Sequence, residues 1–234
     1  MSAVFDLLGA SVDFGAVRAL ERATLRIEPG ERVALIGANG CGKSTLLRLL
    51  HGLIEPSAGS VLRVERARQA MLFQRPYMLR TSAQNQVALA LWLRGQRWRK
   101  ARASALDALA RVGLADLAKR NARALSGGQQ QRLALAQAWA CQPEVLLLDE
   151  PTASLDPHAS RDVEALVDGF AQPHGGSPPV TMVFSSHNLG QVRRLAQRVI
   201  YLEHGHVLAD MPTTDFFNGP LPPAARLFLD GAFA

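Results

Sequence analysis

A glycine-rich stretch over residues 37–45 limits what this chain can fold into more than any other feature. It follows an apolar run over 32–36 and precedes an apolar pattern of helical period over 46–50, so the order predicts a strand, a turn and a helix. Glycines at positions 37, 40 and 42 allow successive backbone N–H groups to face one phosphate chain with no Cβ in the way. The helix start adds unpaired donors and a positive dipole end. The stretch therefore predicts a site for the phosphates of a nucleotide.

Two side chains near the end of this stretch match the chemistry of such a site. Lys43 suits the β- and γ-phosphates, and the hydroxyl of Ser44 suits a Mg²⁺ ion that bridges them. A strand-to-helix turn that binds no ligand is the alternative, but the complete G-x-x-x-x-G-K-S pattern in this setting favours the nucleotide site. Because Cys41 lies at the helix start, we also expect a reactive thiol, which thiol reagents modify and bound nucleotide protects.

Length and composition narrow the class of protein. The chain has 234 residues, of which 48% are hydrophobic, so it can bury one large core or a core and a small subdomain. No apolar run approaches the roughly 18–20 residues of a membrane-spanning helix, and the first residues lack the pattern of a signal peptide. The 2 cysteines make no disulfide framework. These features predict a protein of a reducing, cytoplasmic compartment.

The positive charge of the chain leaves two kinds of partner to consider. The formal net charge of +6 would suit nucleic acid or an anionic membrane surface. The sequence has no zinc-finger spacing, no RNA-recognition aromatics and no basic arm, which argues against nucleic acid. The basic residues around Trp98 are interpreted as a solvated helix face rather than a contact with lipid headgroups; they are Arg94, Arg97, Arg99, Lys100 and Arg102.

Apolar periodicity predicts an α/β chain with one helical interruption. The runs predict, in order, strands at 4–14, 19–27, 61–64, 69–73, 145–149 and 180–184 and a hairpin over 199–209. The first two strands alternate as an antiparallel pair would, whereas the fifth and sixth are apolar on both faces, as in a buried parallel sheet. A helical period from 81 to about 117 indicates an inserted helical subdomain. Residues 173–179 predict an exposed loop.

Four polar residues stand just after apolar runs that we expect to be buried strands. Asp149 and Glu150 close one run, while Gln74 and His187 each follow another. In open α/β sheets the carboxyl ends of the strands form the ligand site. Asp149 can hold the Mg²⁺ ion, directly or through water, and Glu150 can polarise the attacking water. A histidine is usually a core or surface residue without a ligand, but this position favours a phosphate contact for His187.

A second glycine pair, Gly127 and Gly128, opens a predicted helix. Ser126 and Gln129 have the spacing of a capping box, which by itself would explain an ordinary helix start. Glycine in a first turn costs about 1 kcal/mol relative to alanine, so we expect something to approach this backbone closely. An anion at the helix N-terminus is the candidate.

These motifs occur in the order and spacing of the nucleotide-binding subunits of ATP-binding-cassette (ABC) transporters, which the whole chain resembles. The segments that carry the resemblance are 37–45, Gln74, 125–129, 145–150, 154–156 and His187. The resemblance implies an α/β P-loop ATPase with a mostly parallel core sheet, an antiparallel β subdomain and an inserted helical subdomain. It implies one domain over 1–234, with a RecA-like core over 1–74 and 142–234 and a helical signature subdomain over 75–141.

The resemblance also implies roles for individual residues, with ATP and Mg²⁺ as the bound groups. Glu150 would be the general base, and His187 and Lys43 would contact the γ-phosphate. Phe14 would stack on adenine, and the residues around the phosphates would be Gly37, Ala38, Asn39, Gly40, Cys41, Gly42, Lys43, Ser44 and Thr45. Ser44, Gln74 and Asp149 would hold the metal. Ser126, Gly127 and Gly128, with Gln129 beside them, would close over ATP held by a second copy, with Asp156 at the contact between copies.

The chain resembles importer ATPases more than exporter ones, because 119–124 lacks the acidic, glycine-rich stretch that usually precedes the signature in exporters. Residues 73–80, 187–196 and 216–217 are similar to the ATPases of tungstate importers, with phosphate and molybdate importers as near neighbours. This implies a homodimer that sandwiches ATP at the cytoplasmic face of the cell membrane. Separate permease subunits would be its partners, facing Tyr77, Met78 and Leu79, and a substrate-binding protein would be an indirect one. Gln137 and Asn188 depart from the usual arginine and aspartate, which leaves the subfamily open.

Other functions remain as alternatives. An importer ATPase for phosphate, molybdate or an amino acid would carry the same motifs. A non-transport ABC ATPase that acts on DNA or ribosomes would explain the positive charge, although such proteins generally have tandem cassettes or long coiled-coil insertions. A nucleotide-binding module without turnover would share the phosphate site, and Glu150→Gln separates it from an enzyme.

Overall fold

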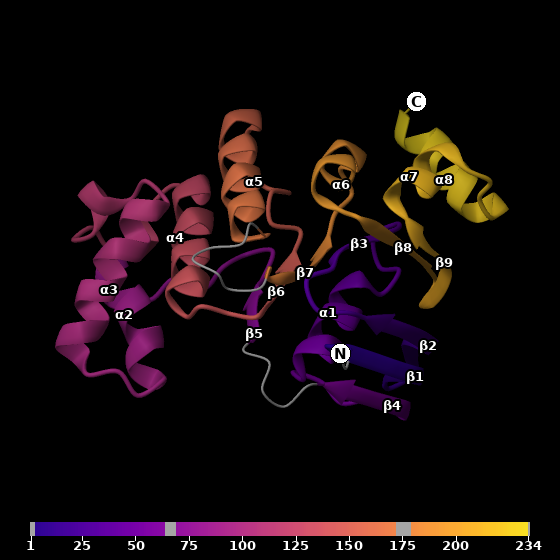
Figure 1. Ribbon diagram of the computed structural model, residues 1–234, viewed down its shortest axis with the longest axis horizontal. Helices are drawn as coiled ribbons and strands as arrows, with labels where there is room; N and C mark the ends of the chain where they lie inside the picture. The colour runs from indigo at the N-terminus through magenta and orange to yellow at the C-terminus, as the bar shows by residue number, and fades with distance from the viewer. Residues whose placement is uncertain (1–2, 64–68, 172–178, 234) are drawn as a thin grey trace.

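The computed structural model describes residues 3–63, 69–171 and 179–233, which form two sheets and a set of helices (Figure 1). Except for Pro179, the loop predicted at 173–179 lies outside the described residues. No helix within the described ranges is long and apolar enough to cross a bilayer.

The larger sheet is six-stranded and mostly parallel, as predicted. Its order is β5-β6-β7-β3-β8-β9, and only the pair of β8 and β9 at the edge is antiparallel. The strands are β3 (Arg32–Ile36), β5 (Gln69–Leu72), β6 (Val145–Asp149), β7 (Thr181–Ser185), β8 (Arg198–Glu203) and β9 (His206–Pro212). β6 and β7 are buried along their whole length, because helices or the smaller sheet cover both faces.

The smaller sheet is three-stranded and antiparallel, with the order β2-β1-β4. Its strands are β1 (Phe5–Phe14), β2 (Val17–Ile27) and β4 (Ala58–Arg63). Helix α1 (Lys43–His51) lies between the two sheets (Figure 1). The three layers share one apolar core, to which Phe5 of β1, Leu47 of α1 and Leu35 of β3 belong. The glycine-rich loop that connects β3 to α1 is therefore held from both sides.

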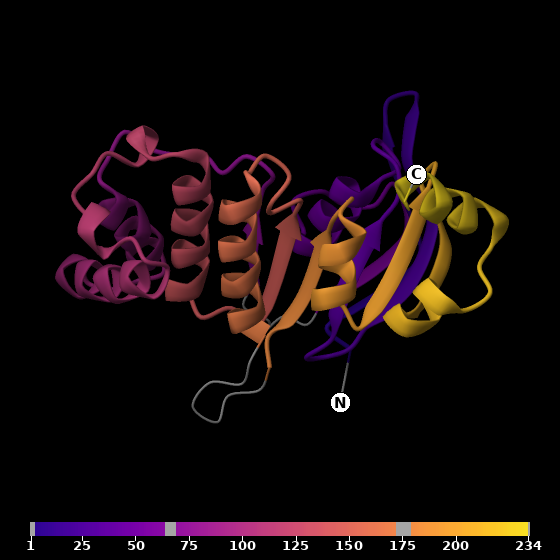
Figure 2. The same ribbon diagram turned by 90° about the horizontal axis from the view of Figure 1, so that it is seen from above.

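A row of helices covers the other face of the larger sheet (Figure 2). These helices are α4 (Gly127–Ala140), α5 (Pro157–Ala171), α6 (Leu189–Leu195), α7 (Thr213–Asn218) and α8 (Pro223–Phe233). Their apolar sides and the sheet form a second core, in which Phe184 and Phe216 are buried completely.

Helices α2 (Ala83–Leu93) and α3 (Trp98–Arg111) form a third core with α4 at one end of the molecule (Figure 1). Two short 3-10 helices, η1 (Ala115–Leu117) and η2 (Ala122–Ala124), connect α3 to α4. Helix α4 belongs to both cores, because Leu133 and Ala136 face α2 and α3 while Leu135 and Ala138 face the sheet side.

The basic residues predicted to form a solvated face are all exposed. Two of them also make hydrogen bonds. The Arg94 guanidinium donates to the carbonyl oxygens of Cys141 (3.0 Å) and Gln69 (3.3 Å), and Arg102 donates to Gln84 Oε1 (3.1 Å). The helical region predicted from 81 to about 117 contains two helices, α2 and α3, separated by the polar, glycine-containing residues 94–97.

Candidate active site

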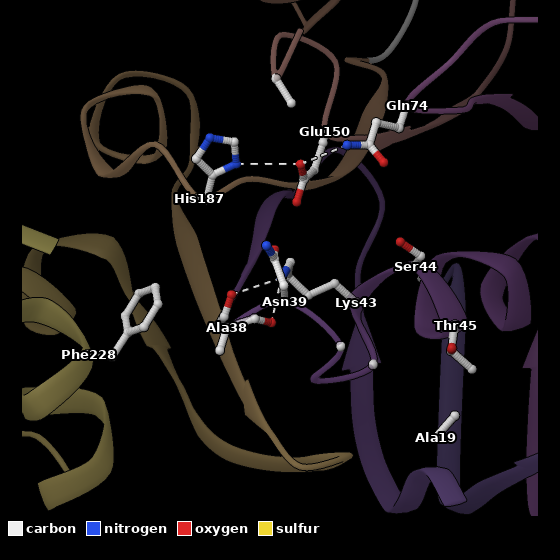
Figure 3. Close-up of a pocket in the computed structure, with 14 residues that line it drawn as sticks. Ala19, Ala38, Asn39, Lys43, Ser44, Thr45, Gln74, Glu150, His187 and Phe228 are labelled. Atoms are coloured by element: carbon white, nitrogen blue, oxygen red, sulfur yellow. Dashed lines mark hydrogen bonds and ion pairs between the residues drawn. The ribbon is translucent and has the colours of Figure 1, made fainter. Parts of the chain in front are cut away.

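The ends of four parallel strands bring the predicted catalytic residues to one edge of the larger sheet. The glycine-rich loop follows β3, Gln74 follows β5, Glu150 follows β6 and His187 follows β7. These side chains surround one hollow, with the loop on one side and Glu150 on the other (Figure 3). The expectation that they meet at the carboxyl edge of the sheet is correct.

The glycine-rich loop runs close to other backbone at Gly37 and Gly42, which accounts for these two glycines. Gly42 has φ 109°, and a Cβ there would lie 2.6 Å from the carbonyl oxygen of Ala19. The buried side chain of Lys43 folds back over the loop, where its Nζ donates to the carbonyl oxygens of Gly37 (2.8 Å) and Ala38 (3.0 Å). The ammonium group is therefore held at the mouth of the loop.

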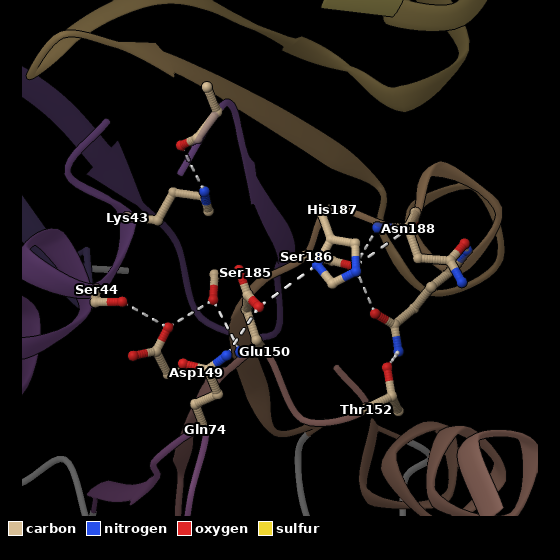
Figure 4. Close-up of polar contacts among 12 residues, drawn as sticks. Lys43, Ser44, Gln74, Asp149, Glu150, Thr152, Ser185, Ser186, His187 and Asn188 are labelled. Carbon is tan, nitrogen blue, oxygen red and sulfur yellow. Dashed lines mark hydrogen bonds and ion pairs between the residues drawn. The ribbon is translucent and has the colours of Figure 1, made fainter. Parts of the chain in front are cut away.

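Asp149 connects the end of β6 to the start of α1. Its Oδ1 accepts hydrogen bonds from Ser44 Oγ (2.9 Å) and Ser185 Oγ (2.8 Å) (Figure 4). A hydroxyl beside a carboxylate is an oxygen donor set of the kind that Mg²⁺ prefers, and Mg²⁺ usually takes its other ligands from water and substrate phosphates. Among the described residues no group of three or more His, Cys, Asp or Glu could hold a metal by itself. The residues present thus fit a metal that is shared with a phosphate chain.

Glu150 adopts a backbone conformation that is uncommon for a side chain of its type. Its φ of 45° is left-handed, and its N–H donates to Ser185 Oγ (2.9 Å), which holds this turn in place. Its carboxylate Oε2 lies 3.4 Å from His187 Nδ1 and accepts from Gln74 Nε2 at 3.3 Å. The turn therefore aims the carboxylate at the hollow, between two polar side chains from neighbouring loops.

The hollow is a cavity of about 770 Å³, within the roughly 300–1,000 Å³ that small-molecule sites span. It is lined by Ala19, Gly37, Ala38, Asn39, Gly40, Gly42, Lys43, Ser44, Thr45, Gln74, Glu150, Ala153, His187 and Phe228. Most of the residues predicted from the glycine-rich loop and the strand ends are among them. The cavity is large enough for the phosphates and part of the rest of a nucleotide.

Cys41 does not have the exposure that a reactive thiol needs. It is buried in the core beneath the loop, and its Sγ accepts a long hydrogen bond of 3.8 Å from Lys43 Nζ. The side chain of Cys41 thus fills space between α1 and the sheets, and the expectation of a thiol open to reagents is wrong.

Phe14 lies at the end of β1, where 50% of its surface is exposed, and it is not part of the cavity lining. Phe228 of α8 lines the cavity instead (Figure 3). Its ring contacts that of Tyr201, with centroids 5.4 Å apart. Ala19, Ala153 and Phe228 are cavity residues that sequence reasoning missed. Small residues and a phenylalanine near the end of the chain carry no motif that could have marked them.

The segment from Ser126 to Gln129 is a helix start away from the cavity lining, with Ser126 and Gly127 exposed and the next two residues half-buried. The predicted capping box is present: Ser126 Oγ accepts from Gln129 N (3.4 Å), and Gln129 Oε1 accepts from Ser126 N (3.0 Å). A Cβ on Gly128 would lie 3.0 Å from the Cβ of Ala159 on α5. Close packing of α4 on α5 is therefore one reason for Gly128, whereas Gly127 has room for a side chain.

Asp156 caps helix α5, as its position before Pro157 predicts. Its Oδ1 accepts from the N–H groups of Ala159 (2.9 Å) and His158 (3.0 Å). The hydrogen bond from Ala159 N–H lowers the pKa of the Asp156 carboxyl below its ordinary value, and that from His158 acts in the same direction. The carboxylate is exposed, so it is open to a second molecule.

Comparison with known proteins gives the same reading of the motifs. A sequence model described as "ABC transporter" matches residues 20–153. The phosphate import ATP-binding protein PstB 2 of Natronomonas pharaonis is 37% identical, over 95% of this chain and 85% of its own length. The nickel import ATP-binding protein NikO of Rhodobacter capsulatus is 39% identical, over 92% of this chain and 91% of its own. The methionine import ATP-binding protein MetN of Cereibacter sphaeroides is 38% identical over 92% of this chain, which spans 64% of that protein.

Solved structures share the fold. A dimeric ATP-binding cassette in a post-hydrolysis state, bound to ADP and phosphate, has a TM-score of 0.79 and 27% identity, with 89% of this chain and 98% of that chain covered. The cassette protein CbiO1 of Clostridium perfringens, part of an ABC transporter complex, has a TM-score of 0.80 and 25% identity, with 93% and 91% covered. The expected cassette fold, with its antiparallel β subdomain and helical region, is confirmed.

Proposed function

Because this chain belongs to the ABC transporter family, we propose that it is the ATP-hydrolysing subunit of an importer for an oxyanion, and that the oxyanion is tungstate. Hydrolysis of ATP is the activity that its relatives share. The single observation that carries the catalytic part is the position of Glu150, whose carboxylate faces Lys43 and the glycine-rich loop across one cavity. A phosphate site and a placed base in one hollow are what an ATPase needs.

The residues divide the chemistry among them. Glu150 accepts a proton from water as the water oxygen attacks the γ-phosphorus, and the bond to the oxygen that bridges the β- and γ-phosphates breaks, so that ADP leaves. Lys43 stabilises the charge on the phosphate oxygens. His187, which lies 3.4 Å from Glu150, contacts the γ-phosphate, and Gln74 orients the water. When bound, Mg²⁺ neutralises phosphate charge; Ser44, Asp149 and Gln74 would hold it.

A second copy completes the site in this proposal. Ser126, Gly127, Gly128 and Gln129 lie outside the cavity of their own chain, although the start of α4 offers unpaired backbone N–H groups. In a head-to-tail homodimer these donors cover the γ-phosphate of ATP held by the partner, with Asp156 at the contact. ATP then closes the pair because it binds the closed form better than the open one.

Residues 75–141 form the helical signature subdomain of the proposed organisation, and the rest of the chain forms the RecA-like core with its β subdomain. A separate apolar core under α2, α3 and α4 supports this division.

The permease would dock beside Gln74, at the cytoplasmic face of the cell membrane, and a substrate-binding protein would deliver the solute. Tyr77 is 75% exposed and suits such a contact, whereas Met78 is 6% exposed and belongs to the core of the helical region. Met78→Glu therefore tests folding rather than docking. We expect Tyr77→Glu to keep ATP hydrolysis by the isolated chain and to weaken co-purification with the permease; unchanged co-purification contradicts this surface.

The oxyanion substrate rests on sequence resemblance at 73–80, 187–196 and 216–217, and the similarity to a phosphate import protein supports the chemical class. Relatives named for nickel and methionine import are similarly close. Selectivity resides in the binding protein and permease, so the test is the assembled importer. Tungstate-loaded binding protein should stimulate ATP hydrolysis more than protein loaded with molybdate or phosphate, and stimulation by a metal cation or an amino acid instead would overturn the proposal.

Glu150→Gln tests the enzymatic part. The amide cannot accept the proton from water, so we expect the hydrolysis rate to fall by about 10²–10⁴-fold while ATP still binds. An ATP-bound dimer should accumulate, measured by size-exclusion chromatography with light scattering. Full hydrolysis by this variant would remove Glu150 from its role, and no hydrolysis by the unaltered chain would favour a binding module without turnover.

A further inference from the structure

A buried glutamine on α6 joins the loop that carries Glu150 to the loop that carries His187. Gln191 is only 1% exposed. Its Oε1 accepts from Ser186 Oγ (2.7 Å), and its Nε2 donates to Thr152 Oγ1 (3.1 Å) (Figure 4). Ser186 directly precedes His187, and Thr152 lies two residues after Glu150. One side chain therefore spans the two loops.

This amide is not needed to begin helix α6. That role belongs to Asn188, whose Oδ1 accepts from the backbone N–H of Gln191 at 3.1 Å. Asn188 N in turn donates to Ser186 Oγ (3.0 Å), so Ser186 is fixed from both sides. Burying an amide costs free energy unless its polar atoms are paired, and an apolar side chain of similar size would avoid that cost. The paired amide instead specifies one arrangement of the two loops.

The turn at Glu150, which is part of this arrangement, needs support from its surroundings. Glu150 has a left-handed backbone, which persists only where the surroundings hold it. Ser185 Oγ supports the N–H of Glu150, from the strand side. The hydrogen bond of Gln191 to Thr152 supports the same turn on its other side, and it ties that turn to the residue before His187.

We propose that Gln191 is a positioning residue that couples Glu150 to His187, so that the base and the γ-phosphate contact are held in register during ATP hydrolysis. This inference rests on the proposed ATPase function. It predicts an effect on the rate of the chemical step and little effect on nucleotide affinity, because neither Gln191 nor Thr152 lines the cavity.

The test compares two variants that remove the bridge with one that keeps it. In Gln191→Leu and Thr152→Val we expect kcat to fall about tenfold, as for one hydrogen bond lost in the transition state, with KM for ATP and the affinity for a fluorescent ATP analogue unchanged. Thr152→Ser retains the hydroxyl and should keep kcat. Gln84→Leu, at a buried glutamine of the helical region, is the control for loss of a buried amide and should also keep kcat.

A double-mutant cycle with His187→Ala separates coupling from general destabilisation. If Gln191 acts through the pair of loops, Gln191→Leu should lower the residual activity of His187→Ala by less than about twofold. A full tenfold loss in that background, or wild-type kcat in Thr152→Val, would overturn the proposal. Thr152→Val carries the test alone if Gln191→Leu does not fold. Inactivity of the unaltered chain would reject the proposed function itself, whereas an active chain that tolerates Thr152→Val rejects only this inference.

Discussion

The chain has two glycine-rich helix starts, the phosphate loop before α1 and residues 126–129 at the start of α4. They differ in how much of a ligand site the same chain supplies around them. At the phosphate edge, Lys43, Asp149 and Glu150 are each held by side-chain hydrogen bonds around one cavity. At the start of α4, Ser126 and Gly127 are exposed and do not line that cavity, and α5 lies beside α4 (Figures 1 and 2).

The difference teaches which part of the site is complete in one chain. The phosphate edge is pre-organised, so it should bind nucleotide by itself. The capping box orders the start of α4, but residues 126–129 do not line the cavity of their own chain. We therefore expect substitutions in the two regions to affect nucleotide binding and ATP hydrolysis differently.

We expect the largest loss of ATP hydrolysis from a single substitution in either region. Lys43→Ala removes the cation at the phosphates, and Gly127→Asp places a negative charge where the partner's γ-phosphate would sit; each should lower ATP hydrolysis by about 10²-fold or more. Gly127→Asp should still bind nucleotide, because its side chain has room and lies outside the cavity.

Mixing the two inactive variants sharpens the comparison. A mixed dimer contains one site with an intact phosphate loop and an intact α4 start, so activity should reappear in the mixture. Activity is measured by phosphate release against each variant alone, with total protein held constant. Full hydrolysis by Gly127→Asp alone would show that the two regions do not meet in a dimer.

A smaller effect is expected at the wall of the cavity. Phe228→Ala removes an aromatic side chain that lines it and should raise KM for ATP about 2–10-fold at unchanged kcat. Phe14→Ala should also raise KM for ATP if adenine stacks on Phe14 at the exposed end of β1. Leu227→Ala is the matched control, since Leu227 is exposed beside Phe228 and does not line the cavity. An unchanged KM in Phe228→Ala would remove α8 from the nucleotide site.

The smallest effect concerns stability at the start of α4. Gly127→Ala should raise the free energy of unfolding by up to about 1 kcal/mol, because alanine favours the helix. Gly128→Ala should gain less or lose stability, since its Cβ would lie 3.0 Å from that of Ala159. Urea unfolding of both variants checks this, and equal gains would mean that α5 can move away.

Much of the fold follows from local patterns. The continuous apolar runs of β6 and β7 predict buried parallel strands, and the alternation in β1 and β2 predicts an antiparallel pair; both predictions are correct. The helical period from 81 to about 117 predicts the helical region, which the structure divides into α2 and α3 at the polar residues 94–97. The hydrogen bonds of Arg94 do not follow from such patterns, since its partners Gln69 and Cys141 are distant along the chain.

The sequence by itself determined the phosphate loop, the polar residues at the strand ends and the cassette family, because spacing along one strand, turn and helix is enough to specify them. Only the tertiary structure decided that Met78 and Cys41 are buried, that Gly128 packs on α5, that Phe228 reaches the cavity and that Gln191 joins two loops. Each of these depends on a neighbour from a different element. Contacts of that kind are set by how helices pack on the sheet, which no local pattern of residues encodes.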